Sequence, residues 1–198
     1  MQRRPFRHLI GALVVGLLAC PAAWAATYTI DPAHSTIGFR IRHLFSYVQG
    51  TFNEFDAAFD YDPDHPELWK AHAVIQAASI DTRVEKRDTH LRSKDFFDAE
   101  QFPTIVFRTT GASDYHDGHA KLKGVLSMHG VDQPVVLDVT VHGVAKDPWG
   151  NIRSGFTATV TLNRKDFGLT WNQTLETGQL LVGEEVEVTI EVEGVLKS

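Results

Sequence analysis

Hydrophobic and polar residues alternate with a period of two along most of the chain after residue 25, the pattern of strands that bury one face. Short segments rich in Gly, Pro, Asp and Asn separate several of these runs and are typical of tight turns. Short turns join antiparallel neighbours. The alternating runs cover residues 37–42, 54–61, 71–77, 104–110, 121–128, 135–141, 156–162 and 186–192.

About eight antiparallel strands with one apolar face must cover that face, either by closing into a barrel or by packing two sheets together. Closure also removes exposed strand edges. A barrel of eight strands has room for its own side chains or for one slim ligand. We therefore predict an all-β fold, an antiparallel eight-stranded barrel in a single domain, with a two-sheet sandwich as the alternative.

The alternation stops between residues 83 and 107, where charged residues and then four phenylalanines follow one another. Thr82 and Glu85 have the spacing of a capping box, and Asp81 is a second candidate cap. Pro103 ends any helix and begins an extended run. The segment predicts one short polar helix, an aromatic turn and a strand.

The N-terminus has the organisation of a secretory signal, with three arginines before an apolar run at residues 9–19 and a small-x-small site at residues 23–25. We expect residues 1–25 to be cleaved, leaving a mature domain of residues 26–198 in the periplasm or outside the cell. An uncleaved membrane anchor and a lipidated Cys20 are the alternatives.

Charge and cysteine content narrow the function further. Removal of Arg3, Arg4 and Arg7 with the leader leaves 16 of the 19 Lys and Arg against 25 Asp and Glu, a net charge of −9. Such an acidic chain is not expected to bind nucleic acid. The only cysteine is Cys20 in the leader, so the mature chain would have no disulfide and no thiolate metal site.

Catalytic and metal motifs are scarce. No nucleophile elbow, zinc-protease motif or phosphate-binding loop occurs in the sequence. Asp88 and His90 are one candidate acid–base pair, although a surface helix rich in ion pairs explains them equally well. His116 and His119 have a loose metal-ligand spacing, but the Asp-Gly turn between them favours a solvated hairpin. We expect no catalytic residues and no metal site.

The segment HLRSKDFFDAEQFPTIVF resembles the signature of the YceI-like family of secreted, lipocalin-like proteins. The resemblance extends in the same order over nearly all of the chain after the leader. The other matching segments lie at residues 31–44, 50–62, 147–172 and 182–195.

This resemblance implies a barrel that holds a long isoprenoid-type lipid, such as a quinone tail or a polyprenyl chain, without covalent attachment. It favours a binding or carrier protein over an enzyme. The rivals are an enzyme acting on an apolar substrate and a module that presents its ligand to a membrane redox partner. The partners expected are the lipid, a membrane contacted transiently and a second copy of the chain in a homodimer.

A filled core and an open cavity require the same alternation, so the strand pattern alone does not separate them. Small residues on the inward faces favour a cavity. The residues predicted to line it are Phe39, Ile41, Phe55, Phe59, Ile75, Leu91, Phe96, Phe97, Phe107, Phe156 and Trp171.

We further predict that the helix lies across one mouth of the barrel, where Arg87, His90 and Arg92 face a lipid headgroup. The alternative is that these cations pair only with Glu85, Asp88 and Asp95.

Overall fold

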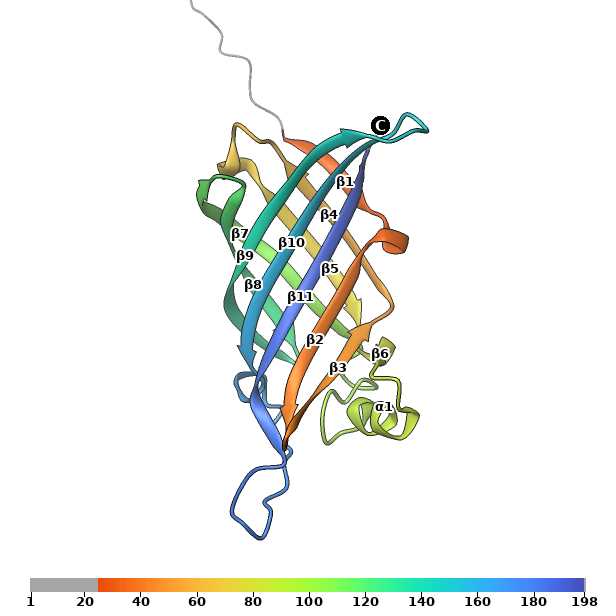
Figure 1. Ribbon diagram of the computed structural model, residues 1–198, viewed down its shortest axis with the longest axis vertical. Helices are drawn as coiled ribbons and strands as arrows, with labels where there is room; N and C mark the ends of the chain where they lie inside the picture. Colours follow the sequence, from red (N-terminus) through yellow and green to blue (C-terminus); the bar gives the residue numbers. More distant parts are fainter. Residues whose placement is uncertain (1–24, 198) are drawn as a thin grey trace, which may run out of the picture.

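The computed structural model describes residues 25–197, so most of the predicted signal peptide lies outside the described residues (Figure 1). Eight strands form a closed antiparallel ring, which confirms the barrel over the sandwich. No helix within residues 25–197 is long and apolar enough to cross a bilayer. In ring order the strands are β1 (Ala26–Ile30), β4 (Phe55–Tyr61), β5 (Lys70–Gln76), β7 (Thr104–His116), β8 (His119–Met128), β9 (Val131–Lys146), β10 (Ile152–Asn163) and β11 (Val182–Leu196).

Three further strands lengthen one side of the ring towards the end where α1 (Glu85–Arg92) lies, at the lower right of Figure 1. β2 (Thr36–His43) continues the line of β1 along β11, and β3 (Ser46–Phe52) pairs with β2. β6 (Ile80–Asp81) pairs with only the last two residues of β3. The barrel wall is therefore fully paired near β1 and incomplete beside α1.

Four short 3₁₀ helices connect or interrupt these strands. The one between β1 and β2 divides what would otherwise be a single long strand. They are η1 (Pro32–His34), η2 (Pro66–Leu68), η3 (Ala77–Ser79) and η4 (Arg164–Phe167).

Two hairpin turns have the left-handed backbone that tight turns require. Asp117 and Gly118 have φ of 49° and 77°, and His129 and Gly130 have φ of 53° and 75°. Two consecutive positive φ angles match the twist of the flanking strands. The first turn joins β7 to β8 in a hairpin whose register shifts between Ser113 and His116, where the ring of His116 bonds to the carbonyl of Asp114.

Aromatic side chains fill the end of the barrel interior nearest β1. Tyr28 stacks on Phe59 with ring centroids 5.1 Å apart, and Phe156 meets Phe59 edge-on at 5.0 Å. Tyr61 and Trp69 lie 5.0 Å apart and are both 5% exposed. Offset and edge-on pairs of this kind add stability beyond the area they bury.

The predicted capping box is wrong. α1 begins after Val84, which makes no side-chain cap, and Thr82 instead donates to Asp88 from both its backbone nitrogen (2.9 Å) and its hydroxyl (2.5 Å). The carboxylate of Asp81 accepts from the backbone nitrogen of Arg83 at 2.7 Å. Asp88 is buried and reaches back from the first turn of the helix, so it takes the hydroxyl that would have capped Glu85.

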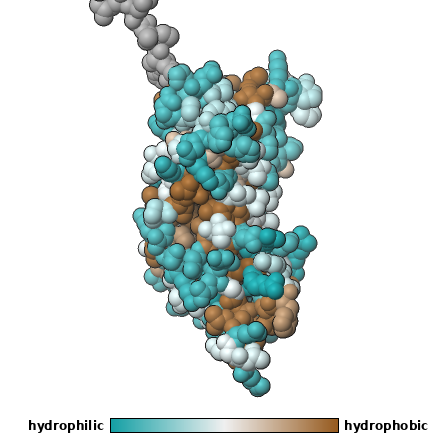
Figure 2. All heavy atoms as spheres, turned by 60° about the vertical axis from the view of Figure 1, so that its left-hand side comes forward, coloured by the Kyte–Doolittle hydropathy of each residue, from teal (hydrophilic) through white to brown (hydrophobic). Residues whose placement is uncertain are grey.

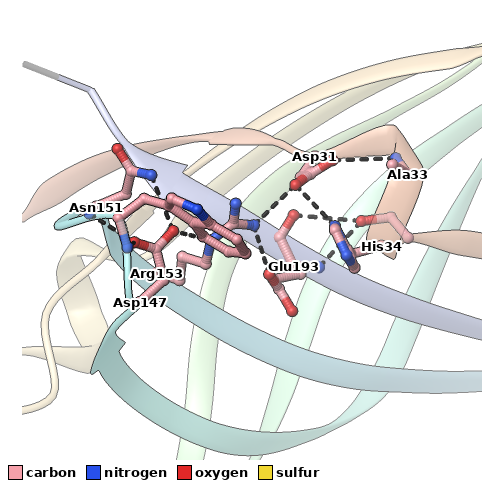
Figure 3. Close-up of polar contacts among 9 residues, drawn as sticks. Asp31, Ala33, His34, Asp147, Asn151, Arg153 and Glu193 are labelled. Atoms are coloured by element: carbon pink, nitrogen blue, oxygen red, sulfur yellow. Dashed lines mark hydrogen bonds and ion pairs between the residues drawn. The ribbon is translucent and has the colours of Figure 1, made fainter.

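Arg153 joins three carboxylates close to where β11 passes η1 (Figure 3). Its guanidinium lies 2.7 Å from Asp31, 2.8 Å from Asp147 and 2.5 Å from Glu193. Donation from Arg153, and then from His34, lowers the pKa of Asp31 to about 2. The same guanidinium holds the pKa of Asp147 well below its usual range.

The carboxylates of Asp31 and Glu193 and the ring of His34 bring ligand atoms within 4.8 Å of one another, as in a metal site. Arg153 donates to both of these carboxylates through the same nitrogen. A guanidinium already supplies the positive charge at this position, so the cluster is a structural ion network.

The Arg153 network should make stability sensitive to acid. Because the folded pKa of Asp31 is below its ordinary 3.8, its contribution is complete above that value and is lost as the pH falls towards 2. The thermal midpoint should therefore drop steeply between about pH 4 and pH 2. Arg153→Gln should lower the midpoint at neutral pH and flatten this dependence. Parallel pH profiles for the two proteins would contradict the assignment.

Candidate functional site

The barrel encloses a cavity of about 660 Å³ whose wall is almost entirely apolar. All of the residues predicted to line it do so except Phe55, which packs instead against the core cluster that includes Ile75. The predicted residues found in the wall are Phe39, Ile41, Phe59, Ile75, Leu91, Phe96, Phe97, Phe107, Phe156 and Trp171.

The cavity exists because small inward residues face one another across strand pairs. Ala57 of β4 lies opposite Ala73 of β5, and both line the cavity. Not every small residue leaves space, because a Cβ added at Gly124 would lie 2.4 Å from the ring of Phe107. Gly124 therefore seats an aromatic ring, whereas the paired alanines leave the interior open.

Polar side chains meet the cavity where α1 borders it. Lys86, Arg87 and His90 of α1 are among the lining residues. His90 packs edge-on against Trp171 and Phe96, with centroids 4.8 Å and 5.1 Å away. These contacts place the polar face of α1 beside aromatic side chains at one end of the cavity. We call this end of the cavity the mouth.

Apolar side chains are also exposed around the mouth. The backbone of Leu44, in the turn between β2 and β3, donates to Leu181 at 3.1 Å, which brings their neighbours Phe45 and Leu180 to the same end. Phe45 is 86% exposed and Leu180 is 45% exposed. Figure 2 shows apolar patches near the lower end of the molecule among polar residues.

The three predicted headgroup residues have different surroundings. Arg87 and His90 line the cavity, and His90 also bonds to Asp95 at 2.8 Å. Arg92 is not among the lining residues, because its guanidinium donates to the carbonyls of Ala78 (2.8 Å) and Ile80 (3.0 Å). Arg92 thus ties α1 to β6, and a headgroup role for the three residues stays a prediction.

Arg164 is a lining residue that the sequence did not single out. It is 3% exposed and donates to the carbonyls of Gly183 and Leu169, which ties η4 to β11. Its second terminal nitrogen has no hydrogen-bond partner within residues 25–197. Burial lowers the pKa of this guanidinium. Arg164 follows the end of the alternating run at residues 156–162, so the sequence pattern gives no sign that this arginine points inward.

The candidate acid–base pair is not assembled. Asp88 is buried and bonds to Thr82, while the ring of His90 bonds to Asp95. The two side chains therefore engage different partners. The arrangement as a whole suits the enclosure of an apolar chain with a polar group at the mouth.

Residues 28–194 match the YceI-like domain family, and this match spans most of the chain. The chain belongs to the YceI-like family. Its curated relatives include a UPF0312 protein of Shewanella baltica, 38% identical with all of both chains covered. Another, from Vibrio cholerae, is 38% identical over 96% of this chain and 99% of the relative.

Solved structures share the fold of this YceI-like protein. The YCEI protein of Campylobacter jejuni is 34% identical, with a TM-score of 0.69 over 86% of this chain and 98% of that one. BcnA of Burkholderia cenocepacia is 22% identical, with a TM-score of 0.72 over 83% and 98%. A polyisoprenoid binding domain from Saccharophagus degradans is 14% identical, with a TM-score of 0.63 over 88% and 100%. The last two likenesses are evidence of the fold alone.

Proposed function

We propose that this YceI-like protein binds and carries a long-chain isoprenoid-type lipid, held without covalent attachment in the barrel. The observation that carries the proposal is the apolar cavity. Aromatic rings pack at one of its ends, and α1 borders the other. The description of a structural relative as a polyisoprenoid binding domain supports the choice of ligand.

The size of the cavity sets the length of chain that it can enclose. A volume of about 660 Å³ holds roughly twenty groups the size of a water molecule, at about 30 Å³ each. At ~0.8 kcal/mol per methylene, some twenty chain carbons would gain roughly 16 kcal/mol relative to water. A bilayer solvates the same chain nearly as well, so transfer between bilayer and barrel is close to neutral. Loading and unloading are then both accessible, as a carrier requires.

Protein purified under native conditions should carry an extractable lipid. The cavity wall offers almost no polar groups that could bind ordered water. Occupancy of the cavity by an apolar chain is therefore favoured over occupancy by water. Mass spectrometry of an organic extract is the measurement. A protein that carries no lipid, and takes up neither a polyprenol nor a quinone when offered, would refute the proposal.

We also propose export and transient membrane contact. The leader of residues 1–25 supports cleavage and delivery to the periplasm or the medium. The exposed side chains of Phe45, Val84 and Leu180 support contact of the mouth with a bilayer surface. Intact-mass measurement of exported protein should give a chain beginning at Ala26, and an acylated chain beginning at Cys20 would contradict this.

A further inference from the structure

A second cavity, of about 650 Å³, lies along the outer side of β2 and β3. Its wall includes Arg40, Gln49, Asp81 and Arg83, so it is polar where the barrel interior is apolar. We call it the outer groove. Sequence reasoning did not find it, because its residues come from two strands and from the connector that precedes α1.

The outer groove meets the barrel cavity, since Phe39, His43, Val48 and Arg87 line both. The meeting point is the edge of β3. Residues 46–50 have β2 on one side, and no strand within the described part of the chain pairs with them on the other. A chain lying in the barrel can therefore pass this edge and leave its terminal group in the outer groove.

The groove contains two cations without an acidic partner among residues 25–197, Arg83 and Arg87. Arg87 donates to the hydroxyl of Thr82 at 2.6 Å and to its carbonyl at 2.8 Å, which fixes the guanidinium at the junction of the two cavities. Arg83 is exposed.

Of the other charges in the groove, Arg40 is paired with Glu187 at 2.6 Å. Asp81 accepts from the backbone nitrogen of Arg83 at 2.7 Å and from Asn53 at 3.4 Å. The groove thus carries an excess of positive charge on a chain whose formal net charge is −6. Local charge complementarity of this kind favours an anionic group there.

We propose that the outer groove binds the phosphate or carboxylate headgroup of a lipid whose chain lies in the barrel. This rests on the proposed function and narrows it, from isoprenoid-type lipids in general to those with an anionic head. A guanidinium can donate two parallel hydrogen bonds to such a group. Arg83 and Arg87 approach it from the outer groove and from the junction.

The test compares geranylgeranyl monophosphate with geranylgeraniol, which share one chain and differ in the head. Wild-type protein should bind the phosphate at least about tenfold more tightly, as expected for one charge-assisted hydrogen bond. Arg83→Gln should remove most of this preference and leave binding of the alcohol unchanged. Arg108→Gln is the matched control, because Arg108 is exposed on β7 and lines neither cavity. Added salt should weaken binding of the phosphate only.

Three results would overturn the assignment. The first is equal affinity for the two lipids, which would leave chain binding intact and remove only the headgroup site. The second is equal loss of phosphate affinity in Arg83→Gln and Arg108→Gln. The third is binding of inorganic phosphate alone with no preference between the lipids, which would make the groove a site for free anions. Failure to bind either lipid would end both this inference and the proposed function.

Discussion

Replacing Ala73 by tryptophan should abolish most lipid binding while the barrel stays folded. Ala73 points into the cavity opposite Ala57, so the indole would occupy space that the chain needs. Displacing some four chain carbons at ~0.8 kcal/mol each would remove about 3 kcal/mol, or on the order of a 100-fold loss of affinity. Titration with a fluorescent polyprenyl analogue measures the loss, and thermal melting reports the fold.

Val74→Trp is the matched control. Val74 is the next residue of β5, so its side chain points to the opposite face, and it does not line the cavity. It should bind lipid as wild type does. Undiminished binding by Ala73→Trp, with an unchanged melting temperature, would show that the chain does not lie in this part of the barrel.

Replacing Asp88 by alanine should destabilise the connector that holds α1 over the incomplete part of the wall. Asp88 is 3% exposed and accepts two hydrogen bonds from Thr82, which is 4% exposed. Each of the two buried donors left without an acceptor costs about 1–3 kcal/mol, so the free energy of unfolding should fall by roughly 2–6 kcal/mol. Denaturant titration measures this change.

Two variants separate the buried hydrogen bonds from a general effect of charge. Asp88→Asn keeps one acceptor oxygen and should lose less stability than Asp88→Ala. Glu85→Ala removes a side chain that is 83% exposed in its pair with Arg92, and should change stability by less than about 1 kcal/mol. The interpretation is wrong if Glu85→Ala and Asp88→Ala are equally unstable.

Most strands could be predicted because the alternation of hydrophobic and polar residues that defines a strand lies within the strand itself. Alternation identified the inward face of nearly every long strand, and the hairpin turns carried their own residue signals. The split of β1 from β2 around η1 was not predicted, because β11 sets both pairings from about 140 to 170 residues away. The capping box failed for a related reason, since Asp88 competed for the hydroxyl of Thr82.

The candidate site could be predicted only in part. Alternation shows which side chains point into the barrel. Whether a small side chain leaves open volume in the cavity depends on the residue that faces it from the neighbouring strand. Gly124 is filled by Phe107, while Ala73 faces another alanine. Arg83 and Arg164 were missed because nothing in the sequence shows that a strand edge is unpaired or that a guanidinium is buried.

The aromatic packing of Tyr28, Tyr61 and Trp69 at the far end gives the barrel a direction. Under the proposed function, a lipid enters this barrel tail first and leaves it head first at the rim beside α1. The donor and the acceptor of the lipid then use this one docking face in turn. Delivery between two membranes then requires the protein to leave one and diffuse to the other, so the rate should depend on the concentration of free protein rather than on any bridging assembly.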